Sequence, residues 1–293
     1  MTTFVSVVET GGISSAARKL EVSPSVVSRM VTELEEHLGV RLLTRTTRLV
    51  RLTDAGSAYF ENCRRILGEL DEAEQSVTGA HSAPRGPLHV TAPVLFGKAY
   101  VMPIVLDYLA RYPEVDLNCW FLDRVVNMID EGIDVGIRIG ELPSSSLQAV
   151  RVGQVRRVLC AAPAYLERQG VPRTPGDLTH HTTLSVNNIS QAPEWRFSAE
   201  DDPVVMRPRP RLTTTTVDSA IAAAVAGFGI TRLLSYQVAS PLREGALRLI
   251  LEDFEPPALP IHVIHREGRH ASRKVRAFLD LAIETLRSDD SLN

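Results

Sequence analysis

Residues 13–31 carry the most structural information in this 293-residue chain and read ISSAARKLEVSPSVVSRMV. Ser14 can cap a short helix whose alanines let a neighbouring helix approach closely. Val22 marks a tight turn. Ser23 and Pro24 then start a second helix, because a hydroxyl caps its first turn and proline at the first helical position loses no hydrogen bond. The stretch therefore predicts helix, turn, helix.

The second helix has two faces. Spacing of i, i+3, i+4, i+7 and i+11 predicts a buried stripe of Val27, Met30, Val31, Leu34 and Leu38, and Gly39 ends the helix. The opposite face carries short hydroxyls and one arginine, namely Ser25, Ser28, Arg29 and Thr32. A polar face is usually only solvated. Here the short side chains would let the helix approach base edges, and an arginine can bind guanine through two hydrogen bonds. We therefore predict a DNA recognition helix that begins at Ser23.

A basic segment follows that helix. Residues 41–51 hold four arginines and no acidic side chain: Arg41, Arg45, Arg48 and Arg51. Apolar residues on either side of a Thr-Thr-Arg tip predict a β-hairpin, which would present arginines and hydroxyls to the DNA backbone or minor groove. The alternative is a hairpin whose arginines serve only solubility. Its place directly after a helix-turn-helix pattern favours DNA contact.

A long helix is expected from Thr53 and Asp54 to about residue 80, where the segment HSAPRGP breaks it. Its apolar positions are spaced 4, 3, 4, 3, 4, which is the rhythm of a coiled-coil seam: Tyr59, Cys63, Ile66, Leu70, Ala73 and Val77. The alternative is a helix that packs on its own domain. The other faces are strongly charged, so a dimer is the simpler partner. A dimer presents two DNA-binding heads and predicts a roughly palindromic operator.

Composition limits the remaining classes. The formal net charge is −3, which does not by itself indicate nucleic-acid binding. No apolar run reaches the length of about 18–20 residues that a membrane span needs, and the start shows no export signal, so we expect a cytoplasmic protein. Cys63, Cys119 and Cys160 lie far apart in sequence and are expected to be reduced and mostly buried. A redox sensor is the alternative for these cysteines.

After residue 87 short strands and helices alternate, which predicts α/β lobes with mainly parallel sheets. About 200 residues exceed one such small sheet, so we expect two lobes with a cleft between them. The expected strands are 88–92, 115–121, 133–139, 155–162, 211–215, 230–233, 247–250 and 261–265. The expected helices are 96–112, 125–131, 217–226 and 272–286.

A cleft between such lobes favours small anionic ligands, because helix N-termini and strand ends converge there. We predict a carboxylate-bearing metabolite as effector. The residues expected to contact it are Pro93, Phe96, Gly97, Arg138, Gly140, Ser144, Thr215 and Thr216. Thr216 could instead cap the following helix, and Arg138 could instead belong to a structural ion pair.

Enzyme motifs are missing. The sequence has no Gly-x-Ser-x-Gly elbow, phosphate-binding loop or His-Glu-x-x-His zinc motif, so neither catalysis nor a metal or other cofactor is expected. The histidines at 180, 181, 262, 265 and 270 are interpreted as surface residues, because acidic or thiolate ligands do not accompany them at regular spacing. Two alternatives stay open: a small-molecule-binding protein of the periplasmic-binding type without specific DNA binding, and an enzyme built on the two-lobed scaffold.

The N-terminal residues resemble the LysR-type transcriptional regulators. The resemblance lies in FVSVVE at 4–9, SSAA at 14–17, SVVSR at 25–29, LLTR at 42–45 and LTDAG at 52–56, and the later domains continue it over nearly the whole chain. The family usually has several more residues before the position of Phe4. The resemblance implies an α/β protein with an N-terminal winged helix-turn-helix, a linker helix and a C-terminal domain of the type II periplasmic-binding-protein fold.

The same resemblance implies site residues and assembly. Pro24, Ser25, Val26, Ser28 and Arg29 would be recognition-helix contacts, with Arg48 on the wing. The partners would be double-stranded DNA, a small-molecule effector, further copies in a homodimer or homotetramer, and RNA polymerase. The chain would cross the hinge near 160–162 and again near 265. The expected domains are 1–53 for DNA binding, 54–80 for dimerisation, 81–87 for a hinge, 88–161 with 266–288 for lobe I, and 162–265 for lobe II.

Overall fold

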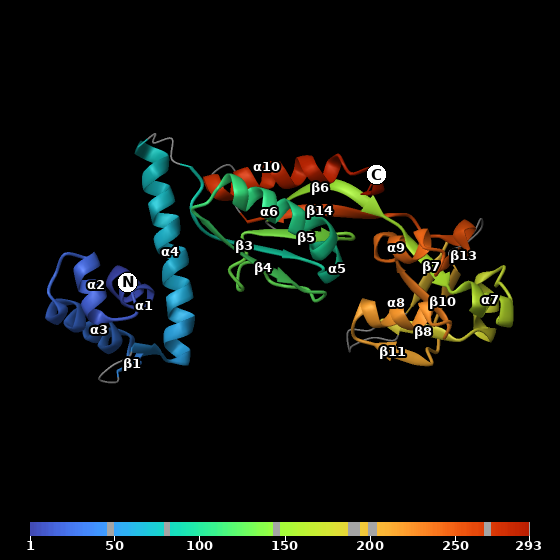
Figure 1. The fold of residues 1–293 in the computed structure, drawn as a ribbon, viewed down its shortest axis with the longest axis horizontal. Helices are drawn as coiled ribbons and strands as arrows, with labels where there is room; N and C mark the ends of the chain where they lie inside the picture. The colour runs from blue at the N-terminus through green and yellow to red at the C-terminus, as the bar shows by residue number, and fades with distance from the viewer. Residues whose placement is uncertain are drawn as a thin grey trace. The chain divides into compact units, whose positions relative to one another are not determined.

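The computed structural model describes residues 1–45, 50–78, 83–142, 147–186, 194–198, 204–266 and 271–292. They form two compact units, Met1–Pro87 and Leu88–Asn293. The first unit contains α1 (Thr2–Glu9), α2 (Ile13–Lys19), α3 (Pro24–Leu38), β1 (Leu43–Arg45), β2 (Val50–Leu52) and α4 (Asp54–Thr78) (Figure 1).

The N-terminal head is a three-helix core with a hairpin. Ser23 caps α3 as expected, because its Oγ accepts a hydrogen bond from the Val26 N–H at 3.4 Å and Pro24 occupies the first turn. Gly39 ends the helix with a φ of 67°, a left-handed conformation that glycine adopts without strain. The core consists of apolar residues from α1, α2, α3, the hairpin and α4: Phe4, Val5, Val7, Ala16, Ala17, Val27, Val31, Leu42, Leu43 and Cys63.

The linker helix α4 begins against the hairpin. The Gly56 N–H donates to Thr53 Oγ1 at 2.9 Å, and the Thr53 hydroxyl in turn donates to the Arg41 carbonyl oxygen at 2.7 Å. A Cβ atom at Gly56 would collide with the Leu42 carbonyl group, so only glycine allows this close approach. Thr53 therefore caps the helix and fixes it to the strand that leads into β1.

The second unit contains two five-stranded sheets. Lobe I holds the sheet of order β4-β3-β5-β14-β6. Its strands are β3 (Gly86–Ala92), β4 (Val115–Phe121), β5 (Val135–Ile139), β6 (Gln148–Val155) and β14 (Leu259–His265). Its helices are α5 (Val94–Phe96), a π-helical turn at Gly97–Val101, α6 (Met102–Arg111), α10 (Arg273–Arg287) and a short 3-10 turn at Asp290–Leu292.

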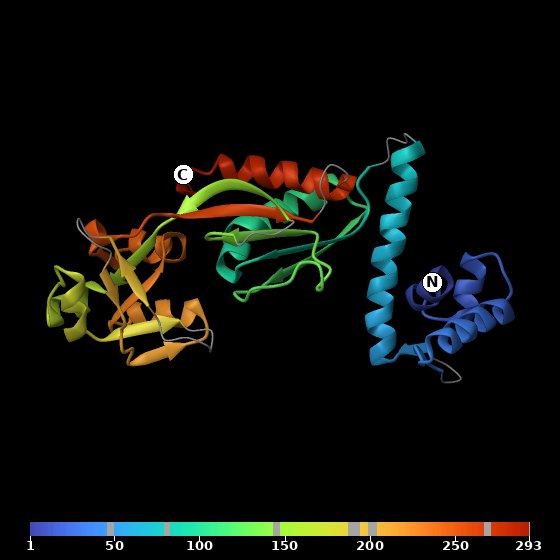
Figure 2. The same ribbon diagram turned by 180° about the vertical axis from the view of Figure 1, so that it is seen from behind.

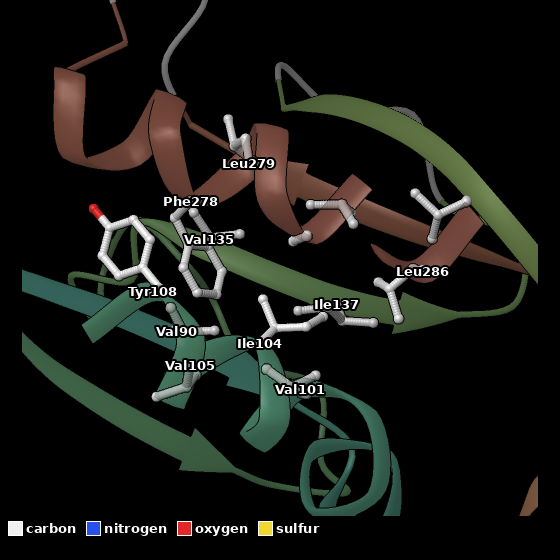
Figure 3. Packing of buried hydrophobic residues seen from close by; sticks show 14 of the residues in the cluster. Val90, Val101, Ile104, Val105, Tyr108, Val135, Ile137, Phe278, Leu279 and Leu286 are labelled. Carbon is white, nitrogen blue, oxygen red and sulfur yellow. The ribbon is translucent and has the colours of Figure 1, made fainter. Parts of the chain in front are cut away.

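The lobe I core lies between this sheet and its helices. Residues of the π-helical turn and α6 (Val101, Ile104, Val105, Tyr108) meet Phe278, Leu279 and Leu286 of α10 over Val90, Val135 and Ile137 of the strands (Figure 3). Tyr108 is fully buried, and its hydroxyl donates to the Lys274 carbonyl oxygen at 2.8 Å. In both ribbon views α10 runs along β6 and β14 (Figures 1 and 2).

Lobe II holds the sheet of order β11-β8-β12-β7-β13 and a separate hairpin of β9 and β10. Its strands are β7 (Arg157–Ala161), β8 (Thr183–Val186), β9 (Trp195–Phe197), β10 (Val204–Met206), β11 (Leu212–Thr214), β12 (Ile230–Leu234) and β13 (Arg248–Ile250). Its helices are α7 (Pro163–Gln169), α8 (Val217–Val225) and α9 (Ala239–Arg243), with 3-10 turns at Pro175–His180, Ser235–Val238 and Glu252–Phe254.

Several expectations for these lobes are wrong. The sheets are mixed rather than mainly parallel: β3 with β5, β8 with β11 and β8 with β12 are parallel pairs. However, β14 is antiparallel to both β5 and β6, and β7 is antiparallel to both β12 and β13. Strands β7 and β14 each come directly after a crossing of the chain between the lobes, so they run antiparallel to their neighbours.

The expected strand 155–162 is two strands in different lobes, because β6 ends at Val155 and β7 begins at Arg157. The chain therefore first crosses between the lobes at Arg156, and it returns between Phe254 and Leu259 instead of near 265. Arg156 Nη1 contacts Glu255 Oε2 at 3.1 Å and joins the two crossings. The break at Arg156 is not visible in the sequence, because the apolar residues on both sides of it look like one continuous strand. In addition, β3 already begins at Gly86, inside the expected hinge.

The expected helix at 125–131 is a series of turns. Arg124 Nη1 donates to Glu131 Oε1 at 2.8 Å, and Asn127 Oδ1 accepts from the Ile129 N–H at 3.1 Å. Val126 and Met128 are buried whereas Val125 is almost fully exposed. Buried and exposed side chains alternate here with a period of two, whereas an α-helix would bury residues three or four positions apart.

Candidate DNA-binding and effector-binding sites

The recognition helix α3 exposes the face that the sequence predicts for DNA. Ser23, Pro24, Ser25 and Arg29 are exposed, and Val26, Ser28 and Thr32 are partly exposed. Arg29 Nε lies 3.6 Å from Glu33 Oε1, with both side chains more than 60% exposed. A surface ion pair of this kind is weak, so the guanidinium can leave it for another acceptor.

The buried face of α3 differs from the prediction. Val27 and Val31 are buried, but Met30 and Leu38 are 45% and 38% exposed. Glu35 is buried in their place, with 3% of its side chain exposed. The apolar spacing could not identify this position, because a carboxylate is normally assigned to the solvent face.

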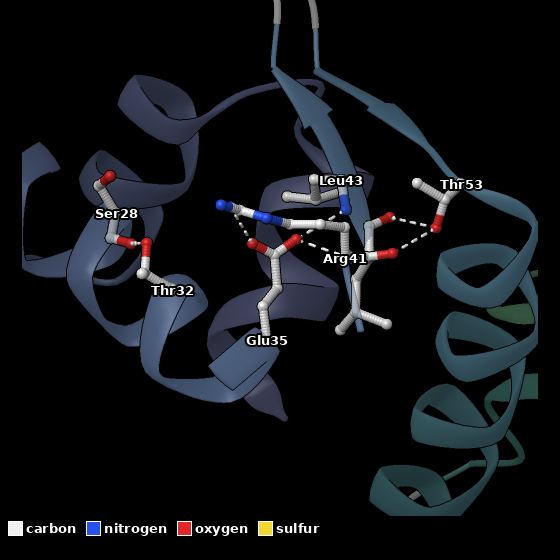
Figure 4. A network of polar contacts seen from close by, with 7 residues as sticks. Ser28, Thr32, Glu35, Arg41, Leu43 and Thr53 are labelled. Carbon is white, nitrogen blue, oxygen red and sulfur yellow. Dashed lines mark hydrogen bonds and ion pairs between the residues drawn. The ribbon is translucent and has the colours of Figure 1, made fainter. Parts of the chain in front are cut away.

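Glu35 connects α3 to the hairpin (Figure 4). Its Oε1 accepts hydrogen bonds from the Leu42 and Leu43 N–H groups at 2.8 and 2.9 Å, and its Oε2 accepts from Arg41 Nη1 at 3.1 Å. Burial raises the pKa of Glu35, but the two backbone hydrogen bonds and Arg41 outweigh it, so the pKa lies below its ordinary value. The buried charge is thus fully compensated, and it holds the first strand of the hairpin against the recognition helix.

The hairpin itself is confirmed, with Leu43 opposite Leu52 and Thr44 opposite Arg51 in an antiparallel pair. Arg51 is exposed. Arg48 lies outside the described residues, as does the side chain of Arg45. Arg41 is engaged with Glu35, so it contributes to structure as well as to positive charge.

The predicted dimer seam on α4 divides into two parts. Tyr59 and Cys63 pack inside the head, where Cys63 is fully buried and the Tyr59 ring lies 5.7 Å from the Phe4 ring. For Cys63 the seam prediction is wrong, because the head buries this side chain completely, whereas Tyr59 is only half-buried. Ile66 and Leu70 are 40% and 53% exposed and stay available to a partner. The side chains of Ala73 and Val77 lie outside the described residues.

In the turn at 93–97 one backbone donor is already engaged by the chain itself. The Val94 N–H donates to Asp123 Oδ1 at 3.0 Å, so a carboxylate of the chain already occupies this position. Phe96 is fully buried and stacks on Tyr100 at 4.7 Å and against Tyr236 at 5.3 Å. A Cβ at Gly97 would collide with the Phe121 ring. Phe96 and Gly97 are therefore explained by packing, while Pro93 is partly exposed beside them.

The threonine turn before α8 is exposed. Thr215 and Thr216 lie at the surface. Thr216 occupies the N-cap position, but its hydroxyl bonds to Ser219 Oγ at 2.8 Å and makes no capping bond to the helix backbone. The capping alternative therefore lacks the side-chain bond that it requires.

Arg138 and His262 form a polar pair on lobe I that the sequence did not suggest. They face each other directly across β5 and β14. Arg138 Nη1 donates to the Ile137 carbonyl oxygen at 3.0 Å, while Arg138 Nη2 and His262 Nδ1 are buried without a hydrogen-bond partner. Burial lowers the pKa of Arg138. His262 is thus not simply a surface residue, and only the strand register could reveal it.

Other predicted positions carry less information. Gly140 follows Arg138 with a φ of 114°, and Ser144 lies outside the described residues. Cys160 is fully buried, which raises its pKa to about 12, and burial also raises the pKa of Cys119. A thiol that is hard to deprotonate reacts slowly with oxidants, so the redox alternative loses support.

No three His, Cys, Asp or Glu side chains of the described residues gather in a way that could hold a metal ion. None of the helices in the described part has the length and apolar composition that a membrane crossing requires.

Comparison with known proteins covers both units. The family described as "Bacterial regulatory helix-turn-helix protein, lysR family" matches residues 1–57, and the "LysR substrate binding domain" matches residues 81–287. A transcriptional repressor of Pseudomonas aeruginosa is 36% identical over 97% of this chain and 90% of its own length. The transcriptional regulator CrgA of Neisseria meningitidis is 32% identical over 98% of this chain and 96% of its own length.

Solved structures agree with these relatives. The structure of CrgA matches with a TM-score of 0.63 at 31% identity, covering 97% of each chain. The full-length virulence activator AphB of Vibrio cholerae also matches with a TM-score of 0.63, at 26% identity over 96% of this chain and 97% of its own.

Proposed function

The chain belongs to the LysR family of DNA-binding transcriptional regulators with an effector-binding domain, and from this premise we propose which residues perform each task. Members of the family bind DNA and small-molecule effectors and act as oligomers. The alternative of a ligand-binding protein without DNA binding is not favoured, because the helix-turn-helix family covers the whole head.

We assign DNA recognition to the exposed face of α3, with Ser23, Pro24, Ser25, Val26, Ser28, Arg29 and Thr32, and to Arg45, Arg48 and Arg51 of the hairpin. The observation that carries this assignment is the exposure of Ser25 and Arg29 on a helix whose other face is locked into the core. Short side chains at the first turns let the helix backbone approach the bases, and Arg29 can reach guanine.

Titration of Arg29→Ala against operator variants tests the assignment. The variant is expected to bind about 1–3 kcal/mol more weakly and to lose base preference at one position. Lys19→Ala, whose amine lies 3.0 Å from Glu9 Oε2 on another helix, is the matched control. If the native protein bound operator and random DNA equally well at a stated salt concentration, the assignment of sequence-specific DNA recognition would be refuted.

Dimerisation is assigned to the later part of α4, starting with Ile66 and Leu70 and continuing to Ala73 and Val77. A dimer would place two heads on a pseudo-palindromic operator, and a homotetramer would pair two such dimers. Leu70→Asp is expected to shift the sedimentation coefficient toward the monomer. Ser57→Asp, nearly opposite on the helix, should leave it unchanged.

The effector is proposed to be a carboxylate-bearing metabolite. Arg138 and His262 of lobe I supply buried, unpartnered nitrogen atoms, and Thr215 and Thr216 of lobe II supply exposed hydroxyls. Calorimetry with a panel of carboxylates tests this. Arg138→Gln and the Thr215→Ala/Thr216→Ala double variant should bind more weakly, whereas Thr213→Ala on the exposed side of β11 should not. Native affinity in both test variants would refute the site.

The remaining parts of the proposal follow from the family. RNA polymerase is a partner at the promoter, and the protein acts in the cytoplasm, because bacterial DNA lies there. The proposed lobe boundaries follow the sheets: 88–155 with 259–288 for lobe I, and 157–254 for lobe II.

A further inference from the structure

Lobe II contains an arginine in an unusual setting. Arg232 lies on β12, with its guanidinium carbon 5.4 Å from the centre of the Phe197 ring. Its Nη2 donates to the Arg196 carbonyl oxygen at 2.7 Å, whereas its Nε is buried without a partner. Burial and the charge of Arg157 lower the pKa of Arg232 to about 10. The guanidinium is held in place by these contacts, and no carboxylate of the described residues contacts it.

Two further arginines surround it. Arg157 lies opposite Leu234, and Arg232 lies opposite Leu159, so the two arginines are diagonal neighbours on one face of the β7–β12 pair. Burial and the nearby Arg196 lower the pKa of Arg157. Arg196 belongs to β9, whose backbone Arg232 contacts. Arg157 and Arg232 therefore share one face of the sheet, and Arg196 lies on the strand whose backbone Arg232 contacts.

Other arginines close to Arg157 and Arg232 in sequence or in the fold do contact carboxylates. Arg156 pairs with Glu255 at 3.1 Å, and Arg207 donates twice to Glu194 Oε1, at 2.9 and 3.1 Å. Arg196 lies 3.6 Å from the same Glu194 and is 71% exposed, so it shares a carboxylate that is already engaged. Within the described residues, Arg157 and Arg232 contact no carboxylate at all.

We propose that Arg157, Arg196 and Arg232 form an anion-binding site on lobe II for a small oxyanion, a carboxylate or a phosphate. Guanidinium groups match both geometrically, because their parallel N–H groups donate to two oxygens at once. Arg157 and Arg232, which contact no carboxylate within the described residues, repel each other, and a bound anion would relieve this repulsion. Phe197 and the Arg196 backbone keep the Arg232 side chain in position before the anion arrives, which reduces the entropy lost on binding.

Calorimetric titration of the full chain with inorganic phosphate, and separately with succinate, tests the site at constant ionic strength. Arg232→Met and Arg157→Gln should each bind the preferred anion about tenfold more weakly or worse. Arg173→Gln, an exposed arginine of lobe II, is the matched control and should bind like the native chain. Raised salt should weaken native binding. The anion that binds with the higher affinity shows whether the site prefers a phosphate or a carboxylate.

Two results would overturn the inference. Neither anion binds to the native chain, or the Arg157 and Arg232 variants bind as tightly as Arg173→Gln. Arg157 is only partly withdrawn from water and is exposed as a whole residue, so Arg157→Gln is expected to keep the fold. Circular dichroism checks both variants. Operator binding is measured in parallel. If the native chain binds its operator but neither anion, this site alone is refuted and the regulator assignment stands.

Discussion

Glu35 in the head and Arg232 in lobe II are both charged side chains withdrawn from water, and their surroundings differ completely. Glu35 accepts two backbone hydrogen bonds and one from Arg41. Arg232 reaches one carbonyl oxygen and has two arginines as neighbours. A buried charge is costly unless it is paired and hydrogen-bonded. The compensated charge therefore stabilises the fold, whereas Arg232, which contacts no carboxylate within the described residues, is the one that we assign to a ligand.

The largest effect is expected for Glu35→Ala. The substitution leaves the Leu42 and Leu43 N–H groups without their acceptor and should destabilise the head by about 3–5 kcal/mol. Hydrogen exchange of amides in α3 and β1 measures it. Arg41→Ala is the comparison, because the exposed side of the pair should contribute less than about 1 kcal/mol. Similar losses for both variants would mean that the carboxylate acts through Arg41 alone.

A smaller effect is expected for Thr53→Val, which removes the second connection of the hairpin. The Gly56 N–H and the Arg41 carbonyl oxygen lose their partner, at a cost of about 1–2 kcal/mol. Protection of the first turn of α4 should fall while α3 keeps its protection. Ser57→Ala, one turn later, controls for general fraying. Equal loss across the head would contradict a local capping role.

Arg232→Met should change the stability of lobe II by no more than about 1 kcal/mol in either direction, because an apolar side chain replaces an uncompensated charge. Denaturant unfolding followed by the fluorescence of Trp195, which is buried in the same lobe, measures this. If Arg232→Met lowered the free energy of unfolding as much as Glu35→Ala does, Arg232 would be a structural residue like Glu35.

Acidification gives the most gradual change. The pKa of Glu35 in the folded head lies below its ordinary value of 4.5, so the unfolded state binds the proton more readily. Its stabilising contribution is complete above about pH 4.5 and is lost as the pH falls through the lowered pKa. Exchange of the β1 amides between pH 6 and pH 3 should show this loss, corrected for intrinsic rates. Glu35→Gln should flatten the dependence, and an unchanged profile in that variant would assign it to another carboxyl group.

The sequence alone determined the features that depend on neighbours along the chain. Ser23 and Pro24 start α3, Gly39 ends it, and a hairpin follows, because caps, turns and short hairpins are formed by residues close in sequence. The face of α3 that the sequence predicts for DNA contact is also the face that the structure exposes. The same local reasoning located most strands and α10.

Tertiary structure alone decided which side chains have partners from distant elements. The seam pattern of α4 is uniform, yet α1 covers Tyr59 and Cys63 and leaves Ile66 and Leu70 exposed. Phe96 is withdrawn from solvent by Tyr236, and His262 is brought to Arg138 by strand register. Burial and charge compensation depend on residues far away in sequence, so no local spacing can predict them.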